Sequence, residues 1–283
     1  MMTRRNFFKY MASLMSTGIS SAALADIIQF SQFKSIQVSV PDDYLKDYLY
    51  KMKYYHEQHR DDILLTGERQ ERLTSTVMRL RRIEKTVGNG NFYLLDFDDA
   101  VHIARSYVRV GAFKKEELDF IEMIFYKDAS VYGFSGQKPF VGLTEKIDQT
   151  KVQKIPDTGN YLYRGLPEET YIKLKKDIGE DVILTSGVRS ITKQLSLFLN
   201  KAYRSYGNLS LASRSLAPPG YSFHAIGDFD VGQANFGVEN FTERFTYTSV
   251  YHKLENLGYV NFRYNRNNML GVRFEPWHIK LYS

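Results

Sequence analysis

Two short clusters of histidine and acidic residues, about fifty residues apart, constrain this chain more than any other feature of its sequence. The first cluster is YSFHAIGDFD at residues 221–230, and the second is FEPWH at residues 274–278. Together they hold two histidines, two aspartates and one glutamate among apolar and aromatic residues. A catalytic zinc site needs three nitrogen or oxygen ligands, an open coordination position and a nearby carboxylate that accepts a proton. We therefore expect the fold to bring the two clusters together around a metal ion.

Within the clusters, His224, His278 and one of two aspartates are the predicted metal ligands, and Glu275 is the predicted base. In an extended segment, side chains an even number of residues apart share a face, so Asp228 and Asp230 can both face a metal held by His224. Glu275 and His278 are three residues apart, which places them on opposite faces of a flat strand. A bend at the intervening proline would bring them to one side.

The sequence has no cysteine, which excludes a disulfide framework, a thiolate nucleophile and cysteine-ligated zinc or iron–sulfur centres. Any metal must therefore be bound by His, Asp or Glu. Hydrophobic residues make up 43% of the 283 residues, enough for one sizeable core or two small ones. The formal net charge is +6, and three of the basic residues (Arg4, Arg5 and Lys9) lie in the first 25 residues. This charge does not indicate a nucleic-acid partner.

Residues 1–25 have the pattern of an export signal, with a basic start, a short and weakly apolar stretch, and the small-residue ending Ala23-Leu24-Ala25. The segment TRRNFFK at residues 3–9 resembles a twin-arginine signal. We therefore expect a mature chain that begins near Asp26 and acts in the periplasm. No later segment offers about 18 uninterrupted apolar residues, so no membrane span is expected in the mature chain.

The remaining chain changes character near residue 150. Residues 26–150 are predicted to be a mainly helical region, to which the sequence assigns no role, and residues 151–283 have an alternating pattern that indicates an α+β fold. Helices are expected over residues 42–82 (two helices), from 96, and over 114–127, 167–179, 190–202 and 246–257. Strands are expected over residues 182–184, 228–231, 259–264 and 271–279, with a loop over 205–220.

The second region resembles the VanY-like D,D-carboxypeptidases, which are D-Ala-D-Ala metallopeptidases of the LAS superfamily. The signature of that family is Ser-x-His-x-x-Gly-x-Ala-x-Asp followed by Glu-x-x-His, often as Glu-Pro-Trp-His. Ser222, His224 and Gly227 match the first part, and residues 275–278 match the second. An upstream family element, Ser-Gly-x-Arg-Ser followed by a Gln, is matched by SGVRS at residues 186–190. The resemblance covers roughly residues 155–283.

This resemblance implies a small antiparallel sheet with flanking helices around a zinc ion, in a peptidase that acts on peptidoglycan stem peptides. The most direct expectation is a zinc D-alanyl-D-alanine carboxypeptidase, with Glu275 as the general base. Arg189, Ser222, Gln194 and Trp277 would bind the substrate, and the arginine fork would hold a carboxylate. A peptidoglycan endopeptidase or an L,D-carboxypeptidase with the same site remains an open alternative.

One departure from the family pattern concerns the third ligand. In the family the aspartate lies seven residues after the histidine, whereas here position 231 is Val and the acids lie four and six residues after His224. A one-residue deletion would align Asp230 with the family ligand, because Val231 then matches the apolar residue that usually follows. Asp228 remains the rival. If neither aspartate reaches the metal, the chain would be a non-catalytic cell-wall-binding protein with a lapsed metal site.

A second pair of histidines, His56 and His59, lies three residues apart among charged residues. The two could bind a metal from one helix face, but their surroundings favour a solvated face.

Overall fold

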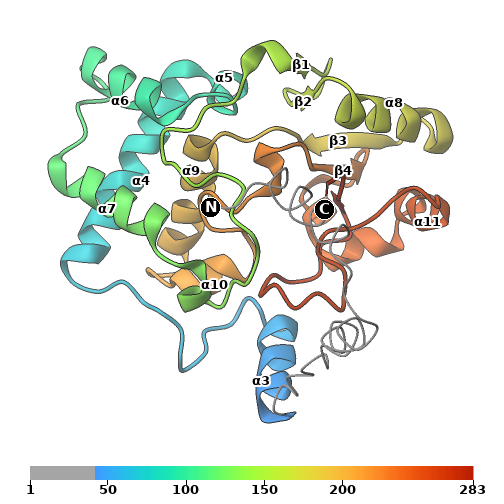
Figure 1. Ribbon diagram of the computed structural model, residues 1–283, viewed down its shortest axis with the longest axis horizontal. Coiled ribbons are helices and arrows are strands. Elements are labelled where there is room, and N and C mark those ends of the chain that lie inside the picture. Colours follow the sequence, from blue (N-terminus) through green and yellow to red (C-terminus); the bar gives the residue numbers. More distant parts are fainter. Residues whose placement is uncertain (1–41, 283) are drawn as a thin grey trace, which may run out of the picture. The chain divides into compact units, whose positions relative to one another are not determined.

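The computed structural model describes residues 42–282 (Figure 1). The predicted export signal over residues 1–25 lies outside the described residues. The chain divides into a unit that ends at Leu45 and a second unit, Lys46–Ser283, which contains all the elements described below except the first four residues of α3. Among residues 42–282, none of the helices has both the length and the hydrophobicity that a membrane span requires.

The region before residue 150 is helical, as its apolar spacing predicts. Its elements are α3 (Asp42–Lys53), α4 (Glu68–Val87), α5 (Asn89–Phe92), α6 (Phe97–Ser106), α7 (Lys115–Tyr126) and the 3-10 turns η1 (Ala129–Tyr132) and η2 (Gln149–Lys151). The helix predicted from Asp96 is present, because the Asp96 carboxylate accepts a hydrogen bond from the N–H of Asp99 and caps the first turn of α6. His56 and His59 follow α3 instead of lying on it.

The region after residue 150 is α+β, with small antiparallel sheets between helices. Its elements are β1 (Val152–Lys154), β2 (Tyr161–Tyr163), α8 (Leu166–Ile178), β3 (Val182–Ser186), α9 (Ile191–Arg204), α10 (Leu209–Ser213), η3 (Phe223–Ala225), β4 (Phe229–Gln233), η4 (Gly237–Phe241), η5 (Glu243–Tyr247), α11 (Ser249–Asn256) and β5 (His278–Ile279). Strands β3, β4 and β5 form an antiparallel sheet with β4 in the centre. This confirms the predicted fold class.

The register of this sheet positions the first predicted ligands. Asp230 on the central strand pairs with Ser186 of β3 on one side and with His278 of β5 on the other. Its neighbours Phe229 and Val231 are fully buried and pack in the core beneath the sheet with the fully buried Leu254 of α11. Because successive strand residues face opposite sides, Asp230 points away from that core.

A second hydrophobic core joins the two halves of the sequence. Helix α4 packs against α7 and α9, and Leu80 and Ile83 of α4 share one buried cluster with Leu195 and Phe198 of α9 (Figure 1). The core therefore crosses the predicted boundary at residue 150, and α9 is held in place by the helical region.

Three sequence-based expectations are wrong in detail. The predicted loop over residues 205–220 contains α10, and α11 begins only at Ser249, after the 3-10 turn η5. Of the strands expected over 259–264 and 271–279, only His278–Ile279 forms, together with an isolated bridge between Phe262 and Ile279. The stretch between them is rich in asparagine, and Asn265 and Asn268 accept hydrogen bonds from nearby backbone N–H groups. Such local bonds compete with strand pairing.

Candidate active site

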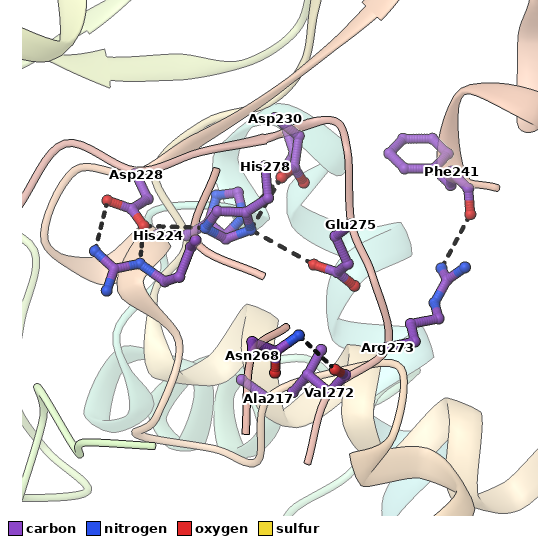
Figure 2. Close-up of polar contacts among 12 residues, drawn as sticks. Ala217, His224, Asp228, Asp230, Phe241, Asn268, Val272, Arg273, Glu275 and His278 are labelled. Carbon is purple, nitrogen blue, oxygen red and sulfur yellow. Dashed lines mark hydrogen bonds and ion pairs between the residues drawn. The ribbon is translucent and has the colours of Figure 1, made fainter. Parts of the chain in front are cut away.

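Three buried side chains from three separate segments converge at one point (Figure 2). His224 comes from the turn η3, Asp230 is the second residue of β4, and His278 is the first residue of β5. One ligand atom from each residue lies within 4.8 Å of the other two. Oδ1 of Asp230 lies 3.3 Å from both Nε2 of His224 and Nδ1 of His278. The fold thus brings the two sequence clusters together, as expected.

The atoms of this cluster that lack hydrogen-bond partners are of the kind that bind a metal ion. Nδ1 of His224 lies 2.8 Å from the carbonyl oxygen of Gly187, a contact that lets the ring donate there and leaves Nε2 as an acceptor. Nε2 of His224 and Oδ1 of Asp230 are buried and have no hydrogen-bond partner. Buried polar atoms without partners are rare and costly in folded proteins. Two imidazole nitrogens and one carboxylate oxygen fit a zinc ion, with room for a fourth ligand.

Asp228 contacts the imidazole ring of His278 at Nε2, the ring nitrogen that does not face Asp230. Its Oδ2 lies 3.0 Å from Nε2 of His278, and its carboxylate also accepts hydrogen bonds from Arg263 and from the N–H of Leu281. In Figure 2, Asp228 and Glu275 lie on either side of His278. Metal-bound histidines commonly donate their second ring N–H to a carboxylate, which fixes the orientation of the ring. Asp228 is therefore placed to orient His278.

The backbone explains why the two aspartates diverge. Gly227 has a φ of +132°, a conformation that L-residues rarely adopt, and it turns the chain between η3 and β4. Asp228 precedes the first residue of β4, so it lies outside the extended segment that carries Asp230. The alternation expected from the sequence therefore does not apply to this pair.

Electrostatics in the cluster favour a neutral His224 beside an ionised Asp230. Burial, with a smaller contribution from the positive charge of Arg189, lowers the pKa of His224 to about 4. Burial alone would raise the pKa of Asp230, but the nearby imidazole and the Arg189 guanidinium hold it well below its usual range. Burial would likewise lower the pKa of His278, yet hydrogen bonds to Asp228 and Glu275 raise it to about 9. His224 and Asp230 are therefore in the protonation states that bind a cation, whereas His278 must release a proton when a metal binds.

Glu275 lies next to the cluster because the chain turns at Pro276 and Trp277. The N–H of His278 donates to the carbonyl oxygen of Glu275, and Oε2 of Glu275 lies 3.6 Å from Nδ1 of His278. The N–H of Glu275 is held by the carbonyl oxygen of Tyr264. The bend that the sequence required between these two residues is thus present, and the Glu275 carboxylate lines the same cavity as the ligands.

The predicted substrate-binding residue Arg189 contacts the cluster, and the predicted Gln194 contacts Arg189. The guanidinium of Arg189 donates to Oδ2 of Asp230 at 2.8 Å, to Ser186 at 2.9 Å and to Gln194 at 3.4 Å. Gln194 in turn donates to the carbonyl oxygen of Ala217. Arg189 therefore holds the second oxygen of Asp230 and leaves Oδ1 facing the histidines. A guanidinium has five N–H donors, so two remain for a ligand.

Ser222 and Trp277 also line the cavity, but both are largely buried. Trp277 is 3% exposed and belongs to the hydrophobic core under the sheet, where its ring meets Phe241 edge-on. Most of its surface therefore serves core packing.

The cavity in front of the cluster has a volume of about 500 Å³. Several of its lining residues were not predicted: Tyr55, His56, Tyr93, Lys193, Lys201 and Arg273. Helical spacing along α9 places Lys201 on the same face as the predicted Gln194, so this signal was available in the sequence. Tyr55, His56 and Tyr93 come from the helical region; of these, the sequence pointed only to His56, as one of a histidine pair expected on a solvated face.

The part of the chain that carries the metal cluster is similar to known proteins. Residues 169–283 match the family model of VanY, described as D-alanyl-D-alanine carboxypeptidase. The predicted resemblance to VanY is confirmed. We refer to residues 169–283 as the VanY-type region; it contains both clusters and the α9 wall of the cavity, whereas Tyr55 and Tyr93 lie outside it.

Solved structures of the same group also match. A zinc-bound mutant of the vancomycin resistance D,D-pentapeptidase VanY from a VanB-type cassette is 20% identical, with a TM-score of 0.33, and the match covers 46% of this chain and 76% of that one. VanYB in complex with D-alanine-D-alanine is 22% identical (46% and 75% covered, TM-score 0.34). The D,D-dipeptidase VanXYg with a D-Ala-D-Ala phosphinate analogue is 21% identical (44% and 51% covered, TM-score 0.37). No curated protein matches the sequence.

Proposed function

We propose that this chain is a zinc-dependent peptidase that removes the terminal D-alanine from peptidoglycan stem peptides. The family match of residues 169–283 supports a peptidase with a peptidoglycan-related role. The observation that carries the zinc assignment is the pair of buried, unpartnered atoms, Nε2 of His224 and Oδ1 of Asp230, which face Nδ1 of His278. Asp228 is assigned the orienting role, because its carboxylate is already bonded to His278, Arg263 and the backbone.

In this proposal His224, Asp230 and His278 hold the ion, and a zinc ion supplies Lewis acidity for the scissile carbonyl and the attacking water. Glu275 takes the proton from that water as its oxygen bonds to the carbonyl carbon. Glu275 then returns the proton to the leaving amine as the peptide bond breaks, which balances the reaction. Arg189 keeps Asp230 ionised and oriented, and its free N–H groups are available for a substrate carboxylate or for the oxygen that gains charge.

The proposed location is the periplasm. Its support is the export-signal pattern of residues 1–25, since a peptidoglycan substrate is met outside the cytoplasm.

The test is a mass-spectrometric digest of purified muropeptides by the protein, with added zinc, with a chelator, and with the Glu275→Gln variant. The matched control is Glu116→Gln, because Glu116 is an exposed glutamate on α7, far in sequence from either cluster. Loss of one alanine from pentapeptides that needs zinc and Glu275 is the expected result. Cleavage of crosslinked dimers would identify an endopeptidase instead. Absence of any product under every condition would overturn the proposal and favour a wall-binding protein.

A further inference from the structure

One face of α9 forms a wall of the cavity that runs away from the metal cluster. Gln194, Leu197 and Lys201 line the cavity at helical spacing. Gln194 contacts Arg189, which contacts Asp230, so this end of the wall lies at the cluster. Lys201 is seven residues further along the helix, a rise of about 10 Å. The wall therefore has a catalytic end and a distant end.

Lys201 marks the distant end with a positive charge that has no partner. Within residues 42–282, its ammonium group makes neither a hydrogen bond nor an ion pair. Lys193, the other lysine on this wall, differs in that its Nζ lies 2.7 Å from a carboxylate oxygen of Glu84. Burial lowers the pKa of Lys201, and so do the nearby positive charges of Arg273 and Arg204. A partly desolvated cation among like charges is unfavourable unless an anion joins it.

Arg273 adds a second, fixed positive charge to this cavity. Its guanidinium lies over the rings of Tyr55 and Trp277, 4.7 and 4.8 Å from their centroids. It donates to the hydroxyl of Tyr55 at 3.2 Å and to the carbonyl oxygen of Phe241 at 2.9 Å, the latter drawn in Figure 2. Its Nε is buried and has no partner. Tyr55 lies outside the VanY-type region, so the helical region helps to position this charge.

The acidic side chains of the cavity cannot neutralise this end. Among the described residues that line it, the only carboxylates are those of Asp230, which belongs to the metal cluster, and Glu275, whose carboxylate lies beside His278 of that cluster. The distant end of the cavity is thus a cationic subsite that the chain itself leaves without a counter-charge.

We propose that Lys201 and Arg273 bind an acidic side chain of the peptide substrate. An extended peptide advances about 3.3 Å per residue, so 10 Å along the wall corresponds to about three residues. In a carboxypeptidase substrate only one residue follows the scissile bond, so the acidic residue lies on the N-terminal side, two or three residues before that bond. The inference rests on the proposed peptidase function and deepens it: the substrates are anionic peptides with a carboxylate at this spacing.

The test uses synthetic pentapeptides that end in D-Ala-D-Ala. Two carry a single glutamate, at the second or the third residue before the scissile bond, and a third carries glutamine at both places. We expect the wild type to prefer one glutamate peptide about tenfold in kcat/KM, the size of a charge-assisted hydrogen bond. Lys201→Met should remove that preference, and Lys201→Arg should keep it. Lys85→Met is the matched control, since Lys85 is an exposed lysine in the last turn of α4, and it should keep the wild-type ratio.

Two outcomes would overturn the inference: a wild type that does not distinguish the peptides, or a Lys201→Met variant that slows all three equally. Calorimetric dissociation constants of the same peptides separate this failure from that of the proposed function. If no peptide is cleaved but a glutamate peptide binds about tenfold more tightly than the glutamine peptide, and Lys201→Met removes the difference, the subsite stands and the peptidase proposal falls. If the peptides are cleaved without discrimination, the peptidase stands and the subsite falls.

Discussion

Two buried charged clusters in this molecule differ in how their polar atoms are used. In the helical region, the guanidinium of Arg79 on α4 donates to both carboxylate oxygens of Glu117 on α7 and to the carbonyl oxygens of Val110 and Gly111. Glu117 also accepts the N–H of Lys114. In the VanY-type region, the cluster of His224, Asp230 and His278 instead leaves buried atoms without partners. A satisfied buried cluster stabilises the fold, whereas an unsatisfied one indicates a ligand.

The largest expected effect is a loss of catalytic rate at the cluster of His224, Asp230 and His278. Glu275→Gln should lower the rate of peptide hydrolysis by about 10²–10⁴-fold, because the amide cannot accept the proton of the attacking water. Zinc affinity should change much less, since Glu275 is not among the proposed ligands. Steady-state hydrolysis and zinc titration of the same preparation measure both. Equal losses in rate and in zinc affinity would contradict the assignment of Glu275 as the base.

A substitution in the Arg79–Glu117 cluster should change the free energy of unfolding and leave zinc binding unchanged. Glu117→Gln leaves the buried Arg79 charge without a counter-ion and should destabilise the protein by about 3–5 kcal/mol. Urea unfolding measures the change, with Glu116→Gln on the exposed side of the same helix as the control. A folded Glu117→Gln variant should bind zinc as the wild type does. A selective loss of zinc binding in that variant would break the distinction between the clusters.

Zinc should stabilise the folded protein by an amount that grows with the logarithm of the zinc concentration above the dissociation constant. A ligand that binds only the folded state adds about 4 kcal/mol at a thousandfold excess over its dissociation constant. Wild-type Tm should therefore rise with added zinc, whereas the Tm of His224→Ala should not. Differential scanning calorimetry with and without a chelator tests this, and an equal rise in both proteins would locate the zinc elsewhere.

The smallest expected effect is a pH dependence of the stability that the Arg79–Glu117 cluster contributes. Burial alone would raise the pKa of Glu117, but hydrogen bonds from Arg79 and from the backbone of Lys114 outweigh it and lower the pKa below its usual value. The unfolded chain therefore binds this proton more readily than the folded protein. The stabilisation from the ionised Glu117 carboxylate is fully present above the pKa that this group has in the unfolded chain. It is lost as the pH falls through the lower pKa that the group has in the folded protein. Between about pH 5 and pH 3, wild type should lose more stability than Glu117→Gln, as urea midpoints would show.

The sequence predicted those features that depend on local patterns. Apolar spacing located α4, α7 and α9, a proline at the start and a glycine at the end located α8, and the carboxylate of Asp96 marked the start of α6 because an N-cap is a local interaction. The metal cluster was recognisable because its residues lie in two short segments. Of the strands expected over 259–264 and 271–279, most residues form no strand, because pairing partners far along the chain decide whether such runs form a sheet.

The residues that line the cavity were less predictable, because contacts between residues far apart in the sequence bring them together. Tyr55 reaches Arg273 across more than two hundred residues of sequence. Lys201 could be placed on the face of α9 that carries Gln194, but its lack of a partner depends on which acids the fold brings near it. Likewise, the division of roles between Asp228 and Asp230 depends on the backbone turn at Gly227, which strand alternation does not describe.

We propose that the cluster of His224, Asp230 and His278 is a metal site with Asp230 as its third ligand. The most direct test measures zinc content and dissociation constants for the wild type, Asp230→Ala and Asp228→Ala. We predict one equivalent of zinc in the wild type, a loss of affinity of about 10–100-fold in Asp228→Ala, as is usual for a carboxylate that orients a ligand, and a larger loss in Asp230→Ala. Wild-type protein without zinc, or a larger loss in Asp228→Ala than in Asp230→Ala, would contradict the account.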